Sequence, residues 1–213
     1  MADKNRAHKI FKILRKAYPH AKAALNFGNP LEVLVATMLS AQCTDKMVNM
    51  VTESLFKKYK KTSDYANANI STFENEIRST GFYKNKAKNV INAAIKIGSD
   101  FNGKVPSSMD ELLKLPGVAR KTANIVLFNG FGKIEGIAVD THVRRLSQRL
   151  GFSKTDDPLK IEQDLMNLFD KKYWGVISFL LINHGRNTCI AKKPKCHECI
   201  LKNLCHSKEK VSP

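Results

Sequence analysis

Long hydrophobic runs are missing from this sequence. The longest apolar run, VISFLLI at Val176–Ile182, is far shorter than the roughly 18 to 20 residues that a helix needs to cross a bilayer. Period-two alternation of apolar and polar residues, the mark of a half-buried strand, is also missing. We therefore expect an all-α protein without a membrane span.

Acidic residues are scarce. The 213 residues include 19 Asp and Glu against 36 Lys and Arg, which gives a formal net charge of +17. A surplus of this size is typical of nucleic-acid binders, although membrane surfaces and ribosomes select it too. With 43% hydrophobic residues, the chain is long enough for one large domain or two small ones. The charge thus indicates a class of partner and no chemistry.

Serine is missing from the basic, amphipathic segment at the start, residues 1–19. A mitochondrial presequence is serine-rich and is followed by a cleavage site, and no such break follows here. The apolar residues of the segment share one face; they are Ile10, Phe11, Ile13, Leu14 and Ala17. We therefore expect a structural first helix and no targeting segment.

Helical spacing and capping residues predict several of the next elements. The segment that opens at Asn29 is apolar on nearly all sides, which is typical of a helix inside a core. Thr44 or Asp45 is expected to cap the helix that follows. Residues Thr72–Thr80 are predicted to form one short helix that ends at Gly81.

Cysteine is nearly confined to the end of the chain. Four of the five lie in the pattern C-x6-C-x2-C-x5-C, at Cys189, Cys196, Cys199 and Cys205. Such crowding indicates a metal site rather than disulfides in a chain without a secretion signal. Structural zinc and an iron–sulfur cluster both accept four thiolates. Zinc usually takes two C-x2-C pairs, and only one is present; the isolated Cys43 is expected to be a small buried residue.

A tight turn followed by a lysine marks the segment from Glu111 to His142. Pro116 stops one helix, Gly117 can take the positive φ of a short hairpin, and helical spacing resumes from Ala119. The amides of residues 117–119 (Gly117, Val118 and Ala119) are expected to point outward at the start of the second helix, where a phosphate can bind. The pattern alone also fits a plain αα-hairpin with a surface lysine.

Four motifs in one order carry a family resemblance. They are LSAQCTD at 39–45, LPGVARKTAN at 115–124, VDTH at 139–142 and the four cysteines. Together they resemble the signature of the endonuclease III family of DNA glycosylases, and the likeness runs from about Ala7 to Lys210. One departure is Gly117-Val118-Ala119, where the family usually has G-x-G.

The resemblance implies a role for several residues. Lys121 falls on the family's nucleophile and Asp140 on its aspartate. Gln42 falls on the glutamine that fills the space left by the displaced base, and Phe82 on the apolar residue that wedges into the duplex. The four cysteines fall on the ligands of a four-iron, four-sulfur cluster, which favours a cluster over zinc.

Lysines are expected to hold the DNA backbone at two places. One set flanks the predicted wedge and consists of Lys84, Lys86 and Lys88. The other lies between the first two cysteine ligands and consists of Lys192, Lys193 and Lys195. A cluster that closes this loop would make the second set a rigid array for phosphates. A charged surface loop is the alternative.

The implied reaction removes a base and then cuts the strand. A damaged base is unreachable inside a duplex, so the enzyme must extrude the nucleotide. Lys121, as a neutral amine, would attack the sugar C1′, while Asp140 would stabilise the developing positive charge and assist proton transfer. The resulting imine permits β-elimination of the 3′ phosphate. The predicted function is a bifunctional glycosylase and AP lyase that acts on oxidised pyrimidines.

The resemblance also implies the organisation of the protein. A six-helix barrel domain is expected at 22–133, with the helix-hairpin-helix at about 108–128. A helical iron–sulfur domain would combine 1–21 with 134–213. We expect a monomer in a prokaryotic cytoplasm, associated with the nucleoid, that binds duplex DNA containing damaged bases or abasic sites.

Two other functions stay open at this point. One is a monofunctional mismatch glycosylase on the same fold, but such relatives carry serine or tyrosine where this chain has Lys121. The other is a DNA-binding helix-hairpin-helix module without catalysis. A simple binding module has no need of both Lys121 and Asp140, nor of the LSAQCTD segment.

Overall fold

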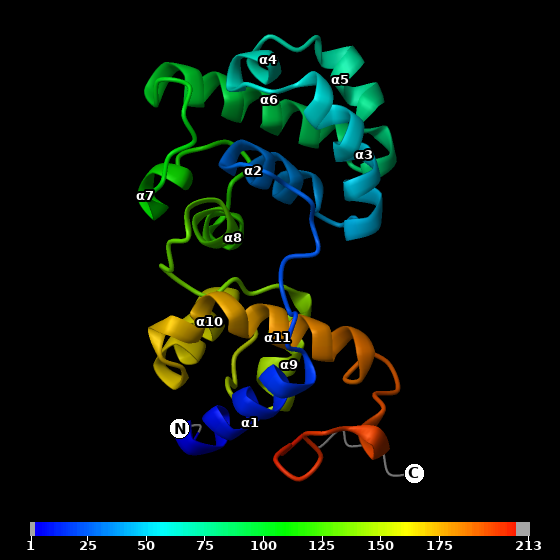
Figure 1. Cartoon of the computed structure of the whole chain (residues 1–213), viewed down its shortest axis with the longest axis vertical. Helices are drawn as coiled ribbons and strands as arrows, with labels where there is room; N and C mark the ends of the chain where they lie inside the picture. The colour runs from blue at the N-terminus through cyan, green and yellow to red at the C-terminus, as the bar shows by residue number, and fades with distance from the viewer. Residues whose placement is uncertain (1–2, 208–213) are drawn as a thin grey trace. The chain divides into compact units, whose positions relative to one another are not determined.

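The computed structural model describes residues 3–207, and helices and loops account for all of them (Figure 1). No strand occurs in this range, so the all-α prediction is confirmed. Nor does any helix in this range combine the length and apolar composition needed to cross a membrane.

Contacts between the helices divide the chain into two compact units. One unit is Ala23–Glu135, and the other takes the residues up to Lys22 together with those from Gly136 onward. Each unit has its own hydrophobic core. The predicted domain limits of 22–133 stay a prediction, because a compact unit is defined by contacts and a domain by independent folding.

The unit Ala23–Glu135 is built around one buried helix. Its helices are α2 (Pro30–Leu39), α3 (Asp45–Lys58), α4 (Thr62–Ala66), α5 (Ile70–Glu76), the 3-10 helix η1 (Arg78–Thr80), α6 (Tyr83–Asp100), α7 (Met109–Leu112) and α8 (Arg120–Phe131). In α2, seven consecutive residues from Val33 to Leu39 are buried, as the apolar pattern predicts. This helix packs against α3, α6 and α8. Asn29 caps it by accepting a hydrogen bond from the Glu32 amide at 3.0 Å.

Capping chemistry also places α3. The Thr44 hydroxyl accepts a hydrogen bond from the Met47 amide at 3.3 Å, so the prediction that Thr44 or Asp45 caps this helix is confirmed. The helix therefore begins two residues after Cys43, and the LSAQCTD segment is held between the end of one helix and the start of the next.

The segment Thr72–Thr80 is not one helix, so that prediction is wrong. Helix α5 ends at Glu76, Ile77 is fully buried, and Arg78–Thr80 form the 3-10 turn η1. The Thr80 hydroxyl donates to the Ile77 carbonyl at 2.8 Å, which stabilises the tighter turn. The turn ends at Gly81, whose φ of +70° suits glycine.

The other unit packs the first helix against two later ones, α10 and α11. Its helices are α1 (Lys4–Ala17), α9 (Thr141–Arg149), α10 (Pro158–Leu168), the 3-10 helix η2 (Lys171–Tyr173), α11 (Trp174–Asn187) and the 3-10 helix η3 (Cys196–Glu198). Ile10 and Leu14 of α1 are fully buried in the core of this unit, which α10 and α11 help to form. Ala17, expected on the same face, is exposed because the helix ends there.

Candidate active site and cluster site

The predicted hairpin contains a β-turn from Leu115 to Val118. The Val118 amide donates to the Leu115 carbonyl at 3.1 Å, with Pro116 and Gly117 at the two central positions. The φ of +74° at Gly117 is what a type II turn requires there. The expectation that the Val118 amide points outward is therefore wrong, because that amide closes the turn. The Val118 side chain is also buried.

The second hairpin helix, α8, has an open N-terminus. Ala119 is its N-cap residue in an extended conformation (φ −95°, ψ 169°), and no side chain caps the helix. Helical spacing suggested a start at Ala119, but the helix begins at Arg120. Alanine fits the extended position without strain, since its φ is negative. Ala119 is exposed, so the partial positive charge of this helix end is open to a phosphate.

Helix α6 brings the hairpin near the two other predicted DNA-contacting loops. A Cβ added to Gly117 would lie 2.8 Å from the Asn89 side chain, so the turn lies directly on this helix. Helix α2, which ends at Leu39 just before the Gln42 loop, also packs against α6. Phe82 is the N-cap residue of α6. The hairpin, the Phe82 loop and the helix that precedes Gln42 therefore all lie against α6.

Predicted DNA contacts coincide with unusual backbone geometry. Within the described residues, four non-glycine residues have positive φ: Gln42 (52°), Phe82 (49°), Asn102 (52°) and Lys193 (52°). Asn tolerates this region well, whereas it is strained for a bulky residue such as Phe. Phe82 is nevertheless 63% exposed, and Gln42 is exposed as well. The fold thus holds both side chains outward at a conformational cost.

Lys86 does not belong to the set of surface lysines. It is only 6% exposed, and its ammonium donates to the Thr80 carbonyl at 2.7 Å. Burial lowers the pKa of this lysine. The expectation that it holds a phosphate is wrong, while Lys84 and Lys88 are exposed. The sequence contained a hint, because Lys86 precedes the buried Val90 by four residues and so shares its face.

The two predicted catalytic side chains lie at helix N-termini. Lys121 is the second residue of α8 and is exposed. Asp140 is the N-cap residue of α9, and its Oδ1 accepts a hydrogen bond from the Val143 amide at 2.8 Å. The loop that leads to Asp140 is held by Ser178, whose hydroxyl donates to the Ala138 carbonyl at 2.8 Å. Oδ2 of Asp140 is not used by the cap.

The four clustered cysteines come together in the unit that contains α9. All are free and partly buried. Burial raises the pKa of the Cys199 thiol, and the neighbouring thiols of Cys189, Cys205 and Cys196 raise it further. No three His, Cys, Asp or Glu side chains of the described residues are placed to hold one metal ion together. An iron–sulfur cubane does not require that, since each thiolate binds its own iron; the donor set fits such a cluster.

Two arginines of α9 fix the loop that starts at Cys189. Arg145 donates to the carbonyls of Gly185 and Cys189 at 2.9 and 3.0 Å. Arg149 donates to the carbonyls of Ile190 and Ala191 at 2.8 and 3.0 Å, and lies 3.5 Å from the Cys189 sulfur. Sequence reasoning missed both, because their partners lie some 40 residues away. The three lysines of the loop are exposed; they are Lys192, Lys193 and Lys195.

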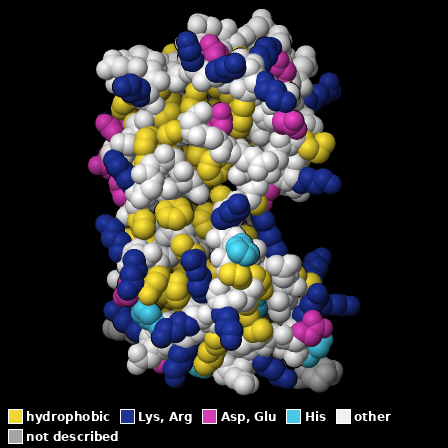
Figure 2. Space-filling model, in the orientation of Figure 1, with side chains coloured by type: hydrophobic (Ala, Val, Ile, Leu, Met, Phe, Trp, Pro, Cys, Tyr) yellow, Lys and Arg dark blue, Asp and Glu magenta, His cyan; other side chains and the backbone are white. Residues whose placement is uncertain are grey.

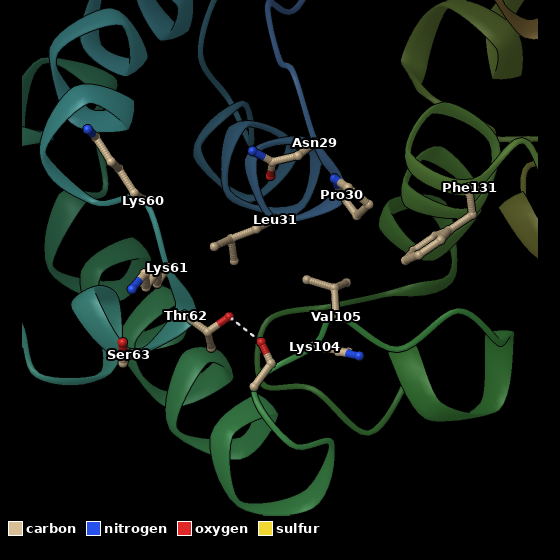
Figure 3. A pocket seen from close by; sticks show the side chains of 11 residues that line it. Asn29, Pro30, Leu31, Lys60, Lys61, Thr62, Ser63, Lys104, Val105 and Phe131 are labelled. Carbon is tan, nitrogen blue, oxygen red and sulfur yellow. Dashed lines mark hydrogen bonds between the residues drawn. The ribbon is translucent and has the colours of Figure 1, made fainter.

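The unit Ala23–Glu135 also contains a pocket of about 590 Å³ (Figure 3). Pro30 at the start of α2 and Phe131 at the end of α8 line it, together with Lys60, Lys61 and Lys104. Gln42 follows the other end of α2, and Lys121 lies at the other end of α8. None of the predicted site residues lines this pocket, so it is not the predicted active site. Lysine and arginine side chains are in any case spread widely over the face in Figure 2.

Comparison with known families defines the class of protein. Residues 35–171 match the HhH-GPD superfamily base excision DNA repair protein, and residues 189–205 match the iron–sulfur binding domain of endonuclease III. The helix-hairpin-helix around Gly117 and the cysteine-rich segment thus lie within two recognised families. The class is that of the helix-hairpin-helix proteins of base excision DNA repair.

Curated relatives narrow the class. Endonuclease III of Synechocystis sp. is 52% identical over 206 residues, which are 97% of this chain and 94% of the relative. Endonuclease III of Bacillus subtilis is 47% identical over 91% of this chain and 88% of the relative. The chain belongs to the endonuclease III family, as the motifs predicted. Its cofactor is accordingly a four-iron, four-sulfur cluster.

Solved structures agree with this assignment. A non-covalent endonuclease III–DNA complex and a trapped endonuclease III–DNA covalent intermediate each match with a TM-score of 0.92 and 43% identity over 97% of this chain. They are matched over 96% and 97% of their own lengths. A thermostable thymine-DNA glycosylase, 23% identical with a TM-score of 0.85, shares the fold. The fold is therefore the all-α fold of these endonuclease III structures, with the hairpin in one compact unit and the four cysteines in the other.

Proposed function

We propose that this protein is a bifunctional DNA glycosylase and AP lyase of base excision repair. One observation carries the proposal: the chain has a lysine at the open N-terminus of the second hairpin helix. It shares its fold, and 43% of its sequence, with an endonuclease III trapped in a covalent complex with DNA. The substrate is duplex DNA with an oxidised pyrimidine or an abasic site. The protein acts as a monomer on one lesion at a time.

The hairpin binds the DNA backbone. The Gly117 and Ala119 amides and the uncapped start of α8 face a phosphate, and Val118 contributes by closing the turn. Phe82 enters the duplex beside the lesion, and Gln42 fills the space of the extruded nucleotide. Their exposure and strained backbones support these roles, because strain of this kind gathers at functional sites.

Lys121 is the nucleophile. Its neutral amine attacks C1′, and the base departs with the electrons of the glycosidic bond and takes up a proton. Loss of a proton from the attached nitrogen and opening of the sugar ring leave an imine between Lys121 and C1′. The imine makes a C2′ proton acidic, and its removal expels the 3′ phosphate. Water then releases the lysine, so the enzyme is restored.

Asp140 supplies negative charge and accepts a proton. The cap uses Oδ1, so this oxygen keeps the carboxylate oriented while Oδ2 faces the sugar. A carboxylate there stabilises the positive charge that develops as the glycosidic bond breaks. It can also take the proton that the attacking amine must lose.

Cys189, Cys196, Cys199 and Cys205 hold the cluster. When bound, the cluster supplies a covalent crosslink that ties the loop of residues 189–205 into one rigid piece. The arginines of α9 hold the backbone of the same loop at residues 189–191. Lys192, Lys193 and Lys195 are thereby presented as a fixed array to the phosphates of the DNA.

A borohydride trapping experiment tests the proposal. The protein is incubated with a duplex that contains one thymine glycol, and borohydride reduces any imine to a stable protein–DNA adduct. We expect an adduct with the wild-type chain and none with Lys121→Ala. Base release without an adduct would instead support a monofunctional glycosylase. Neither release nor adduct on several oxidised pyrimidines would support a DNA-binding module.

A further inference from the structure

A buried cation lies beneath the loop that carries Phe82. The Lys86 ammonium donates to the Thr80 carbonyl at 2.7 Å, and the two residues are only 6% and 2% exposed. A buried ammonium is costly unless it is hydrogen-bonded. Methionine would fill a similar space on this helix face without that cost. The lysine therefore needs an explanation other than packing.

The contact spans the place where the chain changes direction. Thr80 ends the 3-10 turn η1, Gly81 and Phe82 both have positive φ, and α6 starts at Tyr83. Lys86 thus joins the two sides of a loop of two residues. One of these is Phe82, which is strained at a φ of 49° and 63% exposed. A strained, exposed residue keeps its conformation only when its flanks are held.

We propose that Lys86 is a positioning residue for base extrusion: by holding the Thr80 carbonyl it fixes Phe82 in the outward conformation that enters the duplex. The inference rests on the proposed glycosylase function, because extrusion matters only to an enzyme that removes a base.

A double-mutant cycle between Lys86→Met and Phe82→Ala tests this coupling. The measured quantity is the single-turnover rate of base release from a thymine glycol duplex, well below the unfolding temperature. We expect each single change to lower the rate about tenfold, and the double variant to be no slower than Phe82→Ala. Rates that multiply, or a Lys86→Met variant with the wild-type rate, would overturn the proposal.

A second substrate separates positioning from general damage to the enzyme. A duplex with a pre-formed abasic site has no base to extrude, so Lys86→Met should cut it at a rate within about threefold of the wild type. An equal loss on both substrates would contradict the proposal. Lys96→Met is the matched control, because Lys96 lies on the same helix in a surface ion pair with Asp100 at 2.6 Å. It should match the wild type on both substrates.

Two further measurements keep the test decisive. If Lys86→Met does not fold, the cycle is run with Lys86→Arg, which keeps a cation and moves the donor; non-additivity with Phe82→Ala is again expected, and additivity again overturns the proposal. A wild-type chain that neither releases thymine glycol nor forms a borohydride adduct would refute the proposed function itself. That outcome is separate from a working enzyme in which Lys86 and Phe82 act independently.

Discussion

The N-termini of helices α8 and α9 are treated in opposite ways. Helix α9 is capped by the carboxylate of Asp140, which accepts a hydrogen bond from the Val143 amide at 2.8 Å. Helix α8 starts after Ala119, whose methyl group can accept nothing. Capping by Asp, Asn, Ser or Thr is the rule, and alanine at this position costs about 1 kcal/mol.

The difference shows that a helix N-terminus can be capped by the protein's own side chain or left open to bind a ligand. The end of α9 satisfies its own amide and in return orients a carboxylate. The end of α8 leaves its positive end open beside Lys121, where a phosphate can satisfy it. The missing cap lowers the stability of α8, and this cost is explained if the helix end binds a phosphate. At α9 there is no such cost, because the predicted catalytic carboxylate is also the cap.

Lys121→Ala is expected to have the largest effect, because it removes the nucleophile from the open helix end. We expect strand cleavage at an abasic site to fall by at least about a thousandfold. The free energy of unfolding should change little, since the side chain is exposed. Lys104→Ala, a change at an exposed lysine of the pocket, is the control and should cleave normally. Retained cleavage in Lys121→Ala would exclude the imine mechanism.

Asp140→Asn separates charge from capping at α9. Asparagine caps as well as aspartate does, so the free energy of unfolding should stay within a few tenths of a kcal/mol, while base release should fall about a hundred- to a thousandfold. Asp140→Ala should lose both, with about 1 kcal/mol less stability. Thermal unfolding and single-turnover kinetics measure the two quantities. If Asp140→Asn released the base at the wild-type rate, Asp140 would be a structural cap alone.

Ala119→Asp would make α8 resemble α9. The new carboxylate should cap the helix and raise the free energy of unfolding by about 0.5 to 1 kcal/mol. The same carboxylate would repel a phosphate, so affinity for an abasic-site duplex should fall about tenfold. Ala119→Asn, which caps without charge, should stabilise similarly and lose less affinity. Stabilisation without any loss of affinity would show that DNA does not use this helix end.

Lys193→Gln is expected to have the smallest effect, because Lys193 contributes one positive charge among many. Lys193 is exposed, and no ion pair of the described residues involves it. Affinity for undamaged duplex should fall a few-fold, and the slope of log K against log salt should become shallower by about 0.9. Salt titrations of binding measure both, with Lys96→Gln as the control. An unchanged slope would place Lys193 outside the DNA contact.

Sequence reasoning predicted the helices well where capping and periodicity agree. Thr44 caps the helix assigned to it, and the buried run of the helix that opens after Asn29 follows from its apolar composition. The break at Ile77 was missed, because a 3-10 turn and an α-helix share most local preferences. What separates them is a hydrogen bond from the Thr80 hydroxyl and the packing of the turn.

The candidate site was only partly predictable for the same kind of reason. The motif order identified the family, and with it the residues to consider. It could not reveal that the Val118 amide closes a turn, nor that Lys86 is buried. Both facts depend on which acceptor lies next to the Val118 amide and the Lys86 ammonium. That neighbour is set only when the surrounding chain has folded.

The sequence by itself determined the all-α class and the excess of positive charge, and its motif order identified the family. The resemblance to that family in turn implied the cluster. Only the tertiary structure decided that the Gly117 turn lies on α6, the helix that starts after Phe82, and that Arg145 and Arg149 hold the cysteine loop. The physical reason is range: periodicity and capping act over a few residues, whereas these contacts join residues some 30 to 40 positions apart.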